Sequence, residues 1–140
     1  MSSASRPGGD GEQMTGSDGS PTLQHVVLFG FPKDLEPSEH DEFGQLIRTI
    51  GAEVASVENL RLGRDLHLVG DRTRGYQYLM VMEFSGVEPF LAYRAHAAHV
   101  ALSKFIRARK CEVVAFDYFL DDEACVSAAR VRSSSAKRVG

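Results

Sequence analysis

The sequence predicts an α+β domain of the ferredoxin-like type, with an antiparallel sheet and the element order β-α-β-β-α-β. Three observations support this fold class. Four short runs are rich in β-branched and aromatic residues, two longer stretches repeat apolar residues at helical spacing, and the runs and stretches alternate in the ferredoxin-like order. This order places both helices on one face of a four-stranded sheet.

The first half of the domain begins with a strand over residues 23–31, LQHVVLFGF, because the run is short, β-branched and aromatic and is followed by a proline. Apolar residues at helical spacing then predict a helix over residues 38–50. Ser38 is in the position of its N-cap, and Gly51 is expected to end it.

The middle of the domain predicts two further strands. A weak alternation over residues 54–63 indicates the second strand, and a charged loop over residues 64–75 follows. The alternation is much cleaner from Tyr76 to Phe84, which predicts the third strand. One of its faces carries Tyr76, Tyr78, Met80, Met82 and Phe84.

The second helix and the fourth strand complete the pattern. Ser85 and Glu88 have the spacing of a capping box, and apolar positions continue the predicted helix to about residue 107. The run CEVVAFDYFL at residues 111–120 predicts the fourth strand.

The apolar pattern of the strands also predicts an oligomer. The strands carry apolar residues on both faces, whereas two helices cover only one face of a sheet. The same face of a second copy is the simplest cover for the other side. We therefore expect a homodimer in which two four-stranded sheets pack into a shared α/β barrel.

Composition restricts the class of protein further. The 140 residues are 43% hydrophobic with a formal net charge of −3, which is typical of one globular domain and argues against nucleic acid as a partner. No apolar run approaches the length of a membrane span and no secretory signal is visible, so we expect a cytoplasmic protein with no membrane partner. Cys111 and Cys125 lack ligand-type spacing and are predicted to be reduced thiols.

The two ends differ in composition from the domain over residues 22–122. Residues 1–21 consist largely of Gly, Ser, Asp and Pro and predict a disordered leader. Residues 123–140 are rich in Ser, Ala and Arg and predict a flexible basic tail.

Four segments resemble the stress-responsive α/β-barrel domain, or Dabb domain: HVVLFGF, GYQYLMVMEF, AYRAHAAHVAL and VVAFDY. The most specific element is H-x-x-H-V after a tyrosine. The resemblance implies a small dimeric ferredoxin-like barrel. Some members of this family are polyketide cyclases, and others are stress-associated proteins without an assigned reaction.

Resemblance to the cyclases implies that His99 is a catalytic base and Tyr93 a hydrogen-bond donor. The chain departs from the family at two positions, with Ala97 where proline is common and Tyr78 where histidine is frequent. In one unbroken helix Tyr93 and His99 would lie about 120° apart around the axis. Their convergence on one ligand therefore requires a bend between Ala95 and Ala98, or a wide ligand.

The residues themselves suggest a site between sheet and helices. If His25 and Tyr78 point towards the helices, they face the polar residues of the second helix across an apolar layer. The candidate catalytic residues are His99, Tyr93 and His25, and the candidate substrate-binding residues are Tyr78 and His96. A neutral imidazole accepts a proton near neutral pH, and a phenol donates a hydrogen bond to a developing enolate. This chemistry requires no cofactor and no metal.

Each candidate also has a structural interpretation. His25 is equally typical of a buried histidine bonded to a backbone carbonyl, His96 of a surface or helix-turn residue, and His99 of a histidine that ties a helix to the sheet. Tyr93 is also typical of a core residue with a solvated hydroxyl, while His40 and His67 are expected to be solvated. His96 and His99 alone are too few ligands for a stable zinc site. The function therefore remains open between a polyketide cyclase or lyase acting on a polyketone-like or aromatic molecule, a non-catalytic stress-responsive binding or assembly protein, and a cofactor-independent oxygenase.

Overall fold

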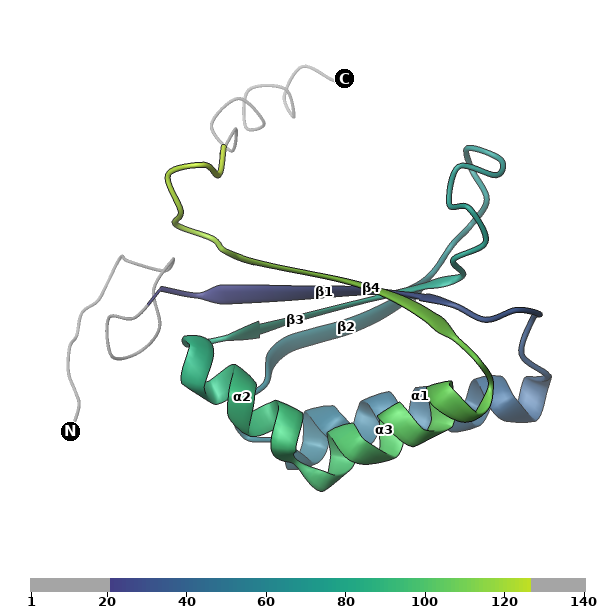
Figure 1. Ribbon diagram of the computed structural model, residues 1–140, viewed down its shortest axis with the longest axis horizontal. Helices are drawn as coiled ribbons and strands as arrows, with labels where there is room; N and C mark the ends of the chain where they lie inside the picture. Colours follow the sequence, from purple (N-terminus) through teal and green to yellow (C-terminus); the bar gives the residue numbers. More distant parts are fainter. Residues whose placement is uncertain (1–20, 127–140) are drawn as a thin grey trace, which may run out of the picture.

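The computed structural model describes residues 21–126, which form a sheet with one face covered by helices (Figure 1). This arrangement confirms the predicted α+β ferredoxin-like fold. The elements are β1 (Leu23–Gly30), α1 (Pro37–Glu53), β2 (Glu58–Arg64), β3 (Tyr78–Phe84), α2 (Val87–Ala95), α3 (Ala97–Ala108) and β4 (Glu112–Phe119). The predictions for residues 1–20 and 127–140 lie outside the described residues.

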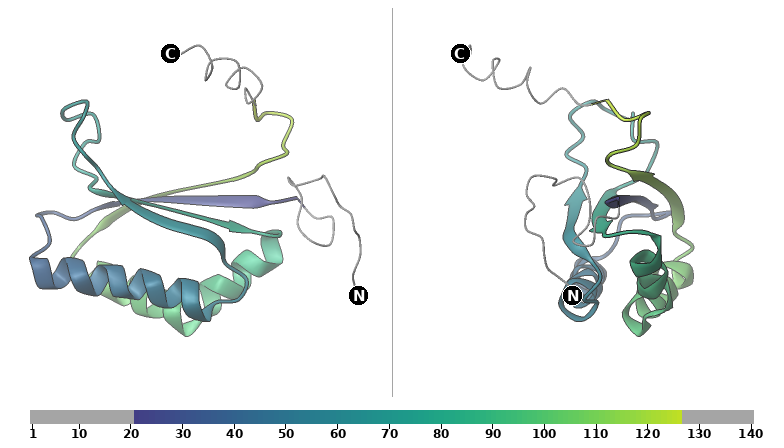
Figure 2. Two further views of the ribbon diagram at one scale, coloured as in Figure 1. Left: turned by 180° about the vertical axis from the view of Figure 1, so that it is seen from behind. Right: turned by 90° about the vertical axis from the view of Figure 1, so that its left-hand side faces the viewer.

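The sheet has the strand order β2-β3-β1-β4, and every neighbouring pair is antiparallel. β1 therefore lies in the interior of the sheet, and β4 and β2 form its edges (Figure 2). His25 of β1 lies opposite Met82 of β3 and Asp117 of β4. Four residues further along β1, Phe29 lies opposite Tyr78.

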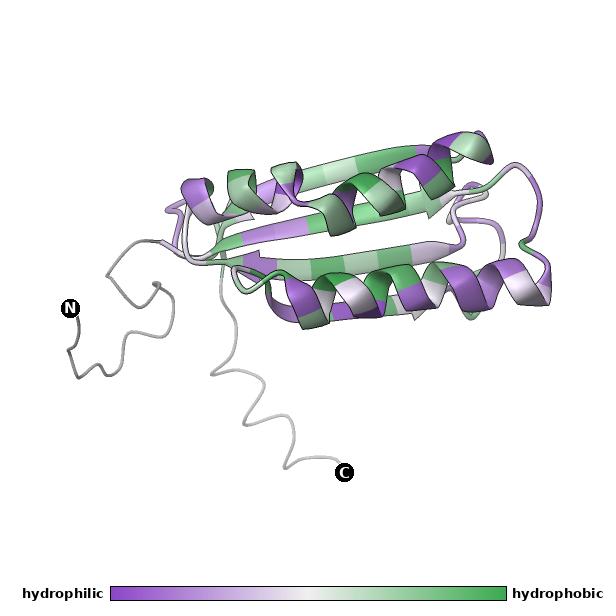
Figure 3. Ribbon diagram, turned by 90° about the horizontal axis from the view of Figure 1, so that it is seen from below, coloured by the Kyte–Doolittle hydropathy of each residue, from purple (hydrophilic) through white to green (hydrophobic). Residues whose placement is uncertain are grey.

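The core lies between this sheet and the helices, where hydrophobic segments of helix and strand face each other (Figure 3). Strand β3 follows the predicted alternation, with alternate residues buried from Tyr78 to Phe84. Helix α1 contributes Phe43, Ile47 and Ile50 to the same core. The apolar period of the sequence thus identifies the inward faces of β3 and α1.

Helix α1 has different ends from those predicted. It begins at Pro37, a residue favoured in a first helical turn because proline has no amide hydrogen to satisfy. Glu36 is the N-cap in place of Ser38, and its backbone N–H donates to the Glu39 carboxylate at 2.9 Å. Gly51 lies inside the helix, which continues to Glu53.

Two strand boundaries also differ from the prediction, because β2 begins at Glu58 and β3 begins at Tyr78. The side chain of Gln77 helps to explain why β3 begins two residues later than predicted. Its amide accepts from the N–H of Phe31 at 2.8 Å and donates to the carbonyl of the same residue at 2.9 Å. The backbone groups of Phe31 thus bond a side chain instead of a further strand residue.

The second helical region consists of two helices rather than the predicted single one. His96 has an extended backbone (φ −74°, ψ 146°) and forms both the C-cap of α2 and the N-cap of α3. Its Nδ1 accepts the backbone N–H of Ala98 at 2.9 Å. The region therefore bends at His96 although no proline is present. The start also differs from the prediction, because Gly86 is the N-cap of α2 and no side chain caps this end.

Candidate functional site

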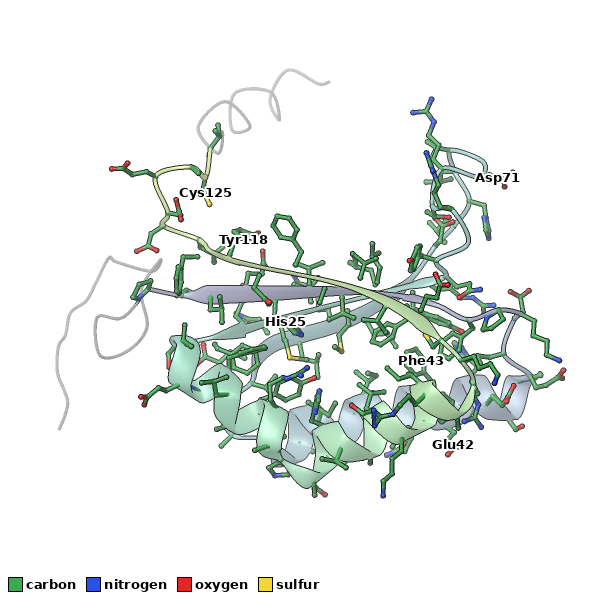
Figure 4. All side chains as sticks on the ribbon, in the orientation of Figure 1. His25, Glu42, Phe43, Asp71, Tyr118 and Cys125 are labelled. Atoms are coloured by element: carbon green, nitrogen blue, oxygen red, sulfur yellow. The ribbon has the colours of Figure 1, made fainter. Side chains whose placement is uncertain are left out.

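Four polar side chains converge on the helix side of the sheet, at the end where β1 begins and β4 ends. His25 comes from β1, Asp117 from β4, Tyr93 from α2 and His99 from α3. Figure 4 shows His25 between the sheet and the helices. Four separate elements thus build this cluster, which we call the His-Tyr site.

His25 is buried and forms a hydrogen bond through Nδ1 with Oδ1 of Asp117. A carboxylate only accepts hydrogen bonds, so the Nδ1–H of His25 is the donor. In neutral His25 this tautomer leaves Nε2 as an acceptor. The Asp117 side chain is 42% exposed, so the pair connects the interior with the edge of the sheet.

The sequence analysis did not select Asp117, although the sequence contains a signal for it. In β4 the inward positions alternate as Val113, Ala115, Asp117 and Phe119, opposite the buried residues of β1. A carboxylate in that series faces the helices, where an unpaired charge is unfavourable. The Asp117 side chain is partly exposed, and on its inward side it pairs with His25.

Tyr93 and His99 lie beside each other because of the bend at His96. Their ring centroids are 4.8 Å apart and their planes meet at 73°. Tyr93 also lies 6.2 Å from the ring of His25, so it stands between the two imidazoles. The bend required for Tyr93 and His99 to converge is thus present.

Burial determines the protonation of Tyr93 and His99. Burial raises the pKa of Tyr93 to about 12, although the nearby charge of Arg94 opposes this shift. Burial also lowers the pKa of His99, and the Arg94 charge adds to that effect. Near neutral pH, Tyr93 is therefore a protonated phenol and His99 a neutral imidazole.

Two further aromatic side chains flank the His-Tyr site. The Phe90 ring lies 5.0 Å from the His25 ring, and the Phe84 ring lies 5.5 Å from that of Tyr93. Apolar neighbours of this kind strengthen the electrostatic interactions between the polar groups.

His96, a predicted substrate-binding residue, lies at the junction of the two helices. Its Nδ1 is occupied by the N–H of Ala98, which matches the structural alternative for this residue. His96 positions Tyr93 and His99 by ending one helix and starting the next.

Tyr78, the other predicted substrate-binding residue, is buried but lies apart from the His-Tyr site. It is paired with Phe29, four residues along β1 from His25, which corresponds to a separation of roughly 13 Å. Its hydroxyl forms a 2.7 Å hydrogen bond with Nδ1 of His40, and Arg64 lies over its ring at 5.5 Å. The prediction that Tyr78 faces the other candidates is wrong, because the register of β1 and β3 places Tyr78 opposite Phe29, whereas His25 lies opposite Met82. His40, expected to be solvated, is only partly exposed.

The described residues contain two free cysteines, Cys111 and Cys125, as predicted. Within residues 21–126, no group of three or more His, Cys, Asp or Glu side chains is arranged to hold a metal ion. None of the helices in this range is long and apolar enough to cross a membrane.

The family model of the stress-responsive A/B barrel domain (Dabb) matches residues 23–120, which include every strand and helix described above. The chain belongs to the Dabb family. This assignment confirms the resemblance of the four sequence segments. No curated protein sequence matches this Dabb chain.

Solved structures share the fold of this Dabb protein. A dimeric ferredoxin-like protein of unknown function from Thermobifida fusca is 23% identical, with a TM-score of 0.64 over 72% of this chain and 92% of that chain. The hydroxynitrile lyase of Passiflora edulis is 19% identical, with a TM-score of 0.65 over 76% and 98% of the two chains. A variant of SnoaB, a cofactor-independent oxygenase from Streptomyces nogalater, is 12% identical, with a TM-score of 0.56 over 76% and 100%. At these identities the similarity establishes a common fold only.

Proposed function

We propose that this Dabb protein is a cofactor-free cyclase or lyase that removes a proton next to a carbonyl group of a small polyketone-like or aromatic molecule. The observation that supports it best is the contact between Tyr93 and His99 at the bend between α2 and α3. Their pKa shifts favour a phenol that donates and an imidazole that accepts.

The proposed reaction uses these two side chains in sequence. His99 accepts the proton from the carbon next to the carbonyl, and the Tyr93 hydroxyl donates a hydrogen bond to the oxygen that becomes an enolate. The enolate carbon then forms a bond to a second carbonyl carbon of the same molecule. The oxygen of that second carbonyl takes the proton back from His99, so the ring closes without any net gain or loss of protons.

His25 and Asp117 have a supporting role in this proposal. The Asp117 carboxylate selects the His25 tautomer with a proton on Nδ1, so Nε2 accepts a hydrogen bond from an enol or hydroxyl group of the substrate. A flexible polyketone bound by His25 and Tyr93 is held in a folded pose, which lowers the entropic barrier to ring closure.

Deuterium exchange tests the proton-transfer step before the natural substrate is known. The protein is incubated in D₂O with a series of β-polyketones, and NMR measures deuterium uptake between the carbonyls together with any ring-closed product. We expect enzyme-dependent uptake that His99→Ala abolishes, whereas the control His67→Ala, at an exposed histidine, retains it. Exchange at the rate of buffer alone for every β-polyketone would contradict the proposal.

Two further measurements distinguish the alternatives. The oxygenase named above makes oxidation of an activated phenol a second candidate, which O₂ consumption with a phenolic substrate would indicate. Saturable binding of the same molecules without exchange, cyclisation or O₂ uptake would favour the non-catalytic binding protein.

We further propose that the chain forms a homodimer through the sheet face opposite the helices, which we call the open face. Its apolar residues are only partly buried or are exposed: Val26, Leu28, Leu79, Val81, Val114 and Phe116. Phe116 is the extreme case, at 64% exposed. Structures of similar fold from Thermobifida fusca and Bacteroides fragilis are described as dimeric, which supports the same assembly here.

A further inference from the structure

We propose that the loop over residues 65–77 is an arm that grips a second copy of the chain seated on the open face. This inference rests on the homodimer proposed above and goes beyond it, because it assigns part of the dimer contact to a loop outside the sheet.

The arm lies on the side of the sheet away from the helices. It rises from the ends of β2 and β3 above the open face, and Asp71 is labelled near its tip (Figures 1, 2 and 4). Three apolar side chains of the arm, separated only by His67, are strongly exposed: Leu66 at 75%, Leu68 at 82% and Val69 at 61%. An exposed apolar cluster of this kind is typical of a protein contact.

The arm has an internal structure of its own. At its base, the backbone N–H of Asp65 donates to the carbonyl of Gln77 at 2.9 Å. In the part that returns to the sheet, the N–H of Tyr76 donates to the carbonyl of Thr73 at 3.0 Å. The Asp65 carboxylate accepts from the Thr73 hydroxyl at 3.3 Å and lies 3.1 Å from Nδ1 of His67. These bonds hold the apolar cluster outward before any partner arrives, which reduces the entropy lost on binding.

The size of the open face explains why an arm is useful. Strands of seven or eight residues in a four-stranded sheet cover a flat area of roughly 20 by 25 Å, or about 500 Å². A stable protein interface typically buries about 800 Å² on each partner. Contacts outside the sheet enlarge the interface, and the arm offers exposed apolar surface beside the sheet.

The arrangement of the chain favours a second copy as the occupant. Residues 120–126 rise on the same side at the other end of the sheet, so the open face lies between two projections (Figure 1). A copy seated there meets both projections and places its own around the first copy, because a two-fold interface uses every contact twice. One dimer therefore buries the exposed apolar clusters of both arms.

Sedimentation equilibrium of the full chain tests the arm. We expect the triple variant Leu66→Ser, Leu68→Ser and Val69→Ser to raise the dimer dissociation constant more than tenfold, because it removes apolar contacts of several side chains in each copy. The matched control carries Val87→Ser, Leu91→Ser and Val100→Ser at exposed apolar positions of the helices and should stay within a factor of about two. An unchanged constant in the arm variant would overturn the inference.

Two further measurements separate the arm from the dimer itself. If Phe116→Glu breaks the dimer while the arm variant dimerises normally, the dimer stands and the arm inference falls. If the unaltered chain is monomeric at tens of micromolar, both fall.

Trypsin cleavage after Arg72 and Arg74 reports on burial directly: protection in the dimer and rapid cleavage in monomeric Phe116→Glu are expected. Protection that persists in that monomer would mean that the chain's own ends cover the arm, and would overturn the inference.

Discussion

Tyr93 and His99 acquire their chemical character from burial. Burial disfavours the charged form of each group, so the phenol keeps its proton and the imidazole stays neutral. The Arg94 charge weakens the first effect and strengthens the second, whereas a hydrogen bond with the Arg94 backbone opposes the lowering of the His99 pKa. The same apolar surroundings thus prepare a donor and an acceptor side by side.

Substitution at these two residues is expected to separate their roles. His99→Ala should abolish turnover of a β-polyketone, because the proposed reaction assigns the proton transfer from carbon to His99. Tyr93→Phe should lower kcat by a smaller factor, on the order of 10² to 10³, as expected for losing one oxyanion donor. Steady-state kinetics on folded variants measures both effects, and two folded, fully active variants would remove the catalytic assignment.

The lowered pKa of His99 also predicts a pH dependence of stability. The unfolded chain protonates this residue near its ordinary pKa of about 6.5, and the folded chain does so only at lower pH. The unfolded state therefore binds more protons as pH falls below about 6.5, and stability decreases until the folded pKa is passed. Above that range His99 has no such effect.

Urea denaturation at pH 7.5, 6.5 and 5.5 measures this dependence, with His99→Gln as the reference because glutamine does not titrate. The free energy of unfolding of the unaltered chain should fall relative to the variant as pH decreases. A difference that stays constant over this range would show that the folded state does not disfavour protonation of His99.

At the level of elements, the bend between α2 and α3 brings the site together. His96 is essential to it because its side chain caps α3 and its extended backbone ends α2. His96→Ala should lower the free energy of unfolding by about 1 kcal/mol through loss of the cap, and should lower turnover as Tyr93 and His99 separate. His96→Asn is the matched control, since asparagine is a good N-cap and should preserve both properties.

The absence of the family's proline has a related consequence. Ala97 is the first residue of α3, where a backbone N–H has no partner within the helix, so proline loses nothing there. His96 already has the extended backbone that is favoured in a residue before proline. Ala97→Pro should therefore fold normally and gain about 0.4 to 1 kcal/mol by restricting the unfolded chain. Thermal and urea denaturation measure this gain, and a clear destabilisation would mean that the backbone at the bend differs from that described here.

For the whole molecule, the unequal faces of the sheet lead to the expected assembly. The helices bury one face, whereas Phe116 and its neighbours leave the other apolar and open. Light scattering at micromolar concentration should give about twice the chain mass of 15.4 kDa. Phe116→Glu places a charge on this face, on the edge strand β4, and should give the mass of one chain. A monomer of the unaltered chain would require another cover for the sheet.

The order of elements, the inward faces of β3 and α1, and the family are readable from the sequence, because each depends on periodicity or on short motifs. The alternation from Tyr78 to Phe84 reports a half-buried strand wherever it occurs, and the histidine motif after Tyr93 carries the family resemblance. Such local signals do not depend on knowing which strands are neighbours.

Three features of the site depend on the tertiary structure. Strand register decides that His25 meets Asp117 and that Tyr78 lies away from both. His25 and Asp117 are 92 positions apart in the sequence, so no local pattern relates one to the other. The bend at His96 depends on a hydrogen bond that competes with a continuous helix, and the balance between the two is not visible in the apolar period. The pKa shifts of Tyr93 and His99 follow from burial, which only the packed layers of sheet and helix create.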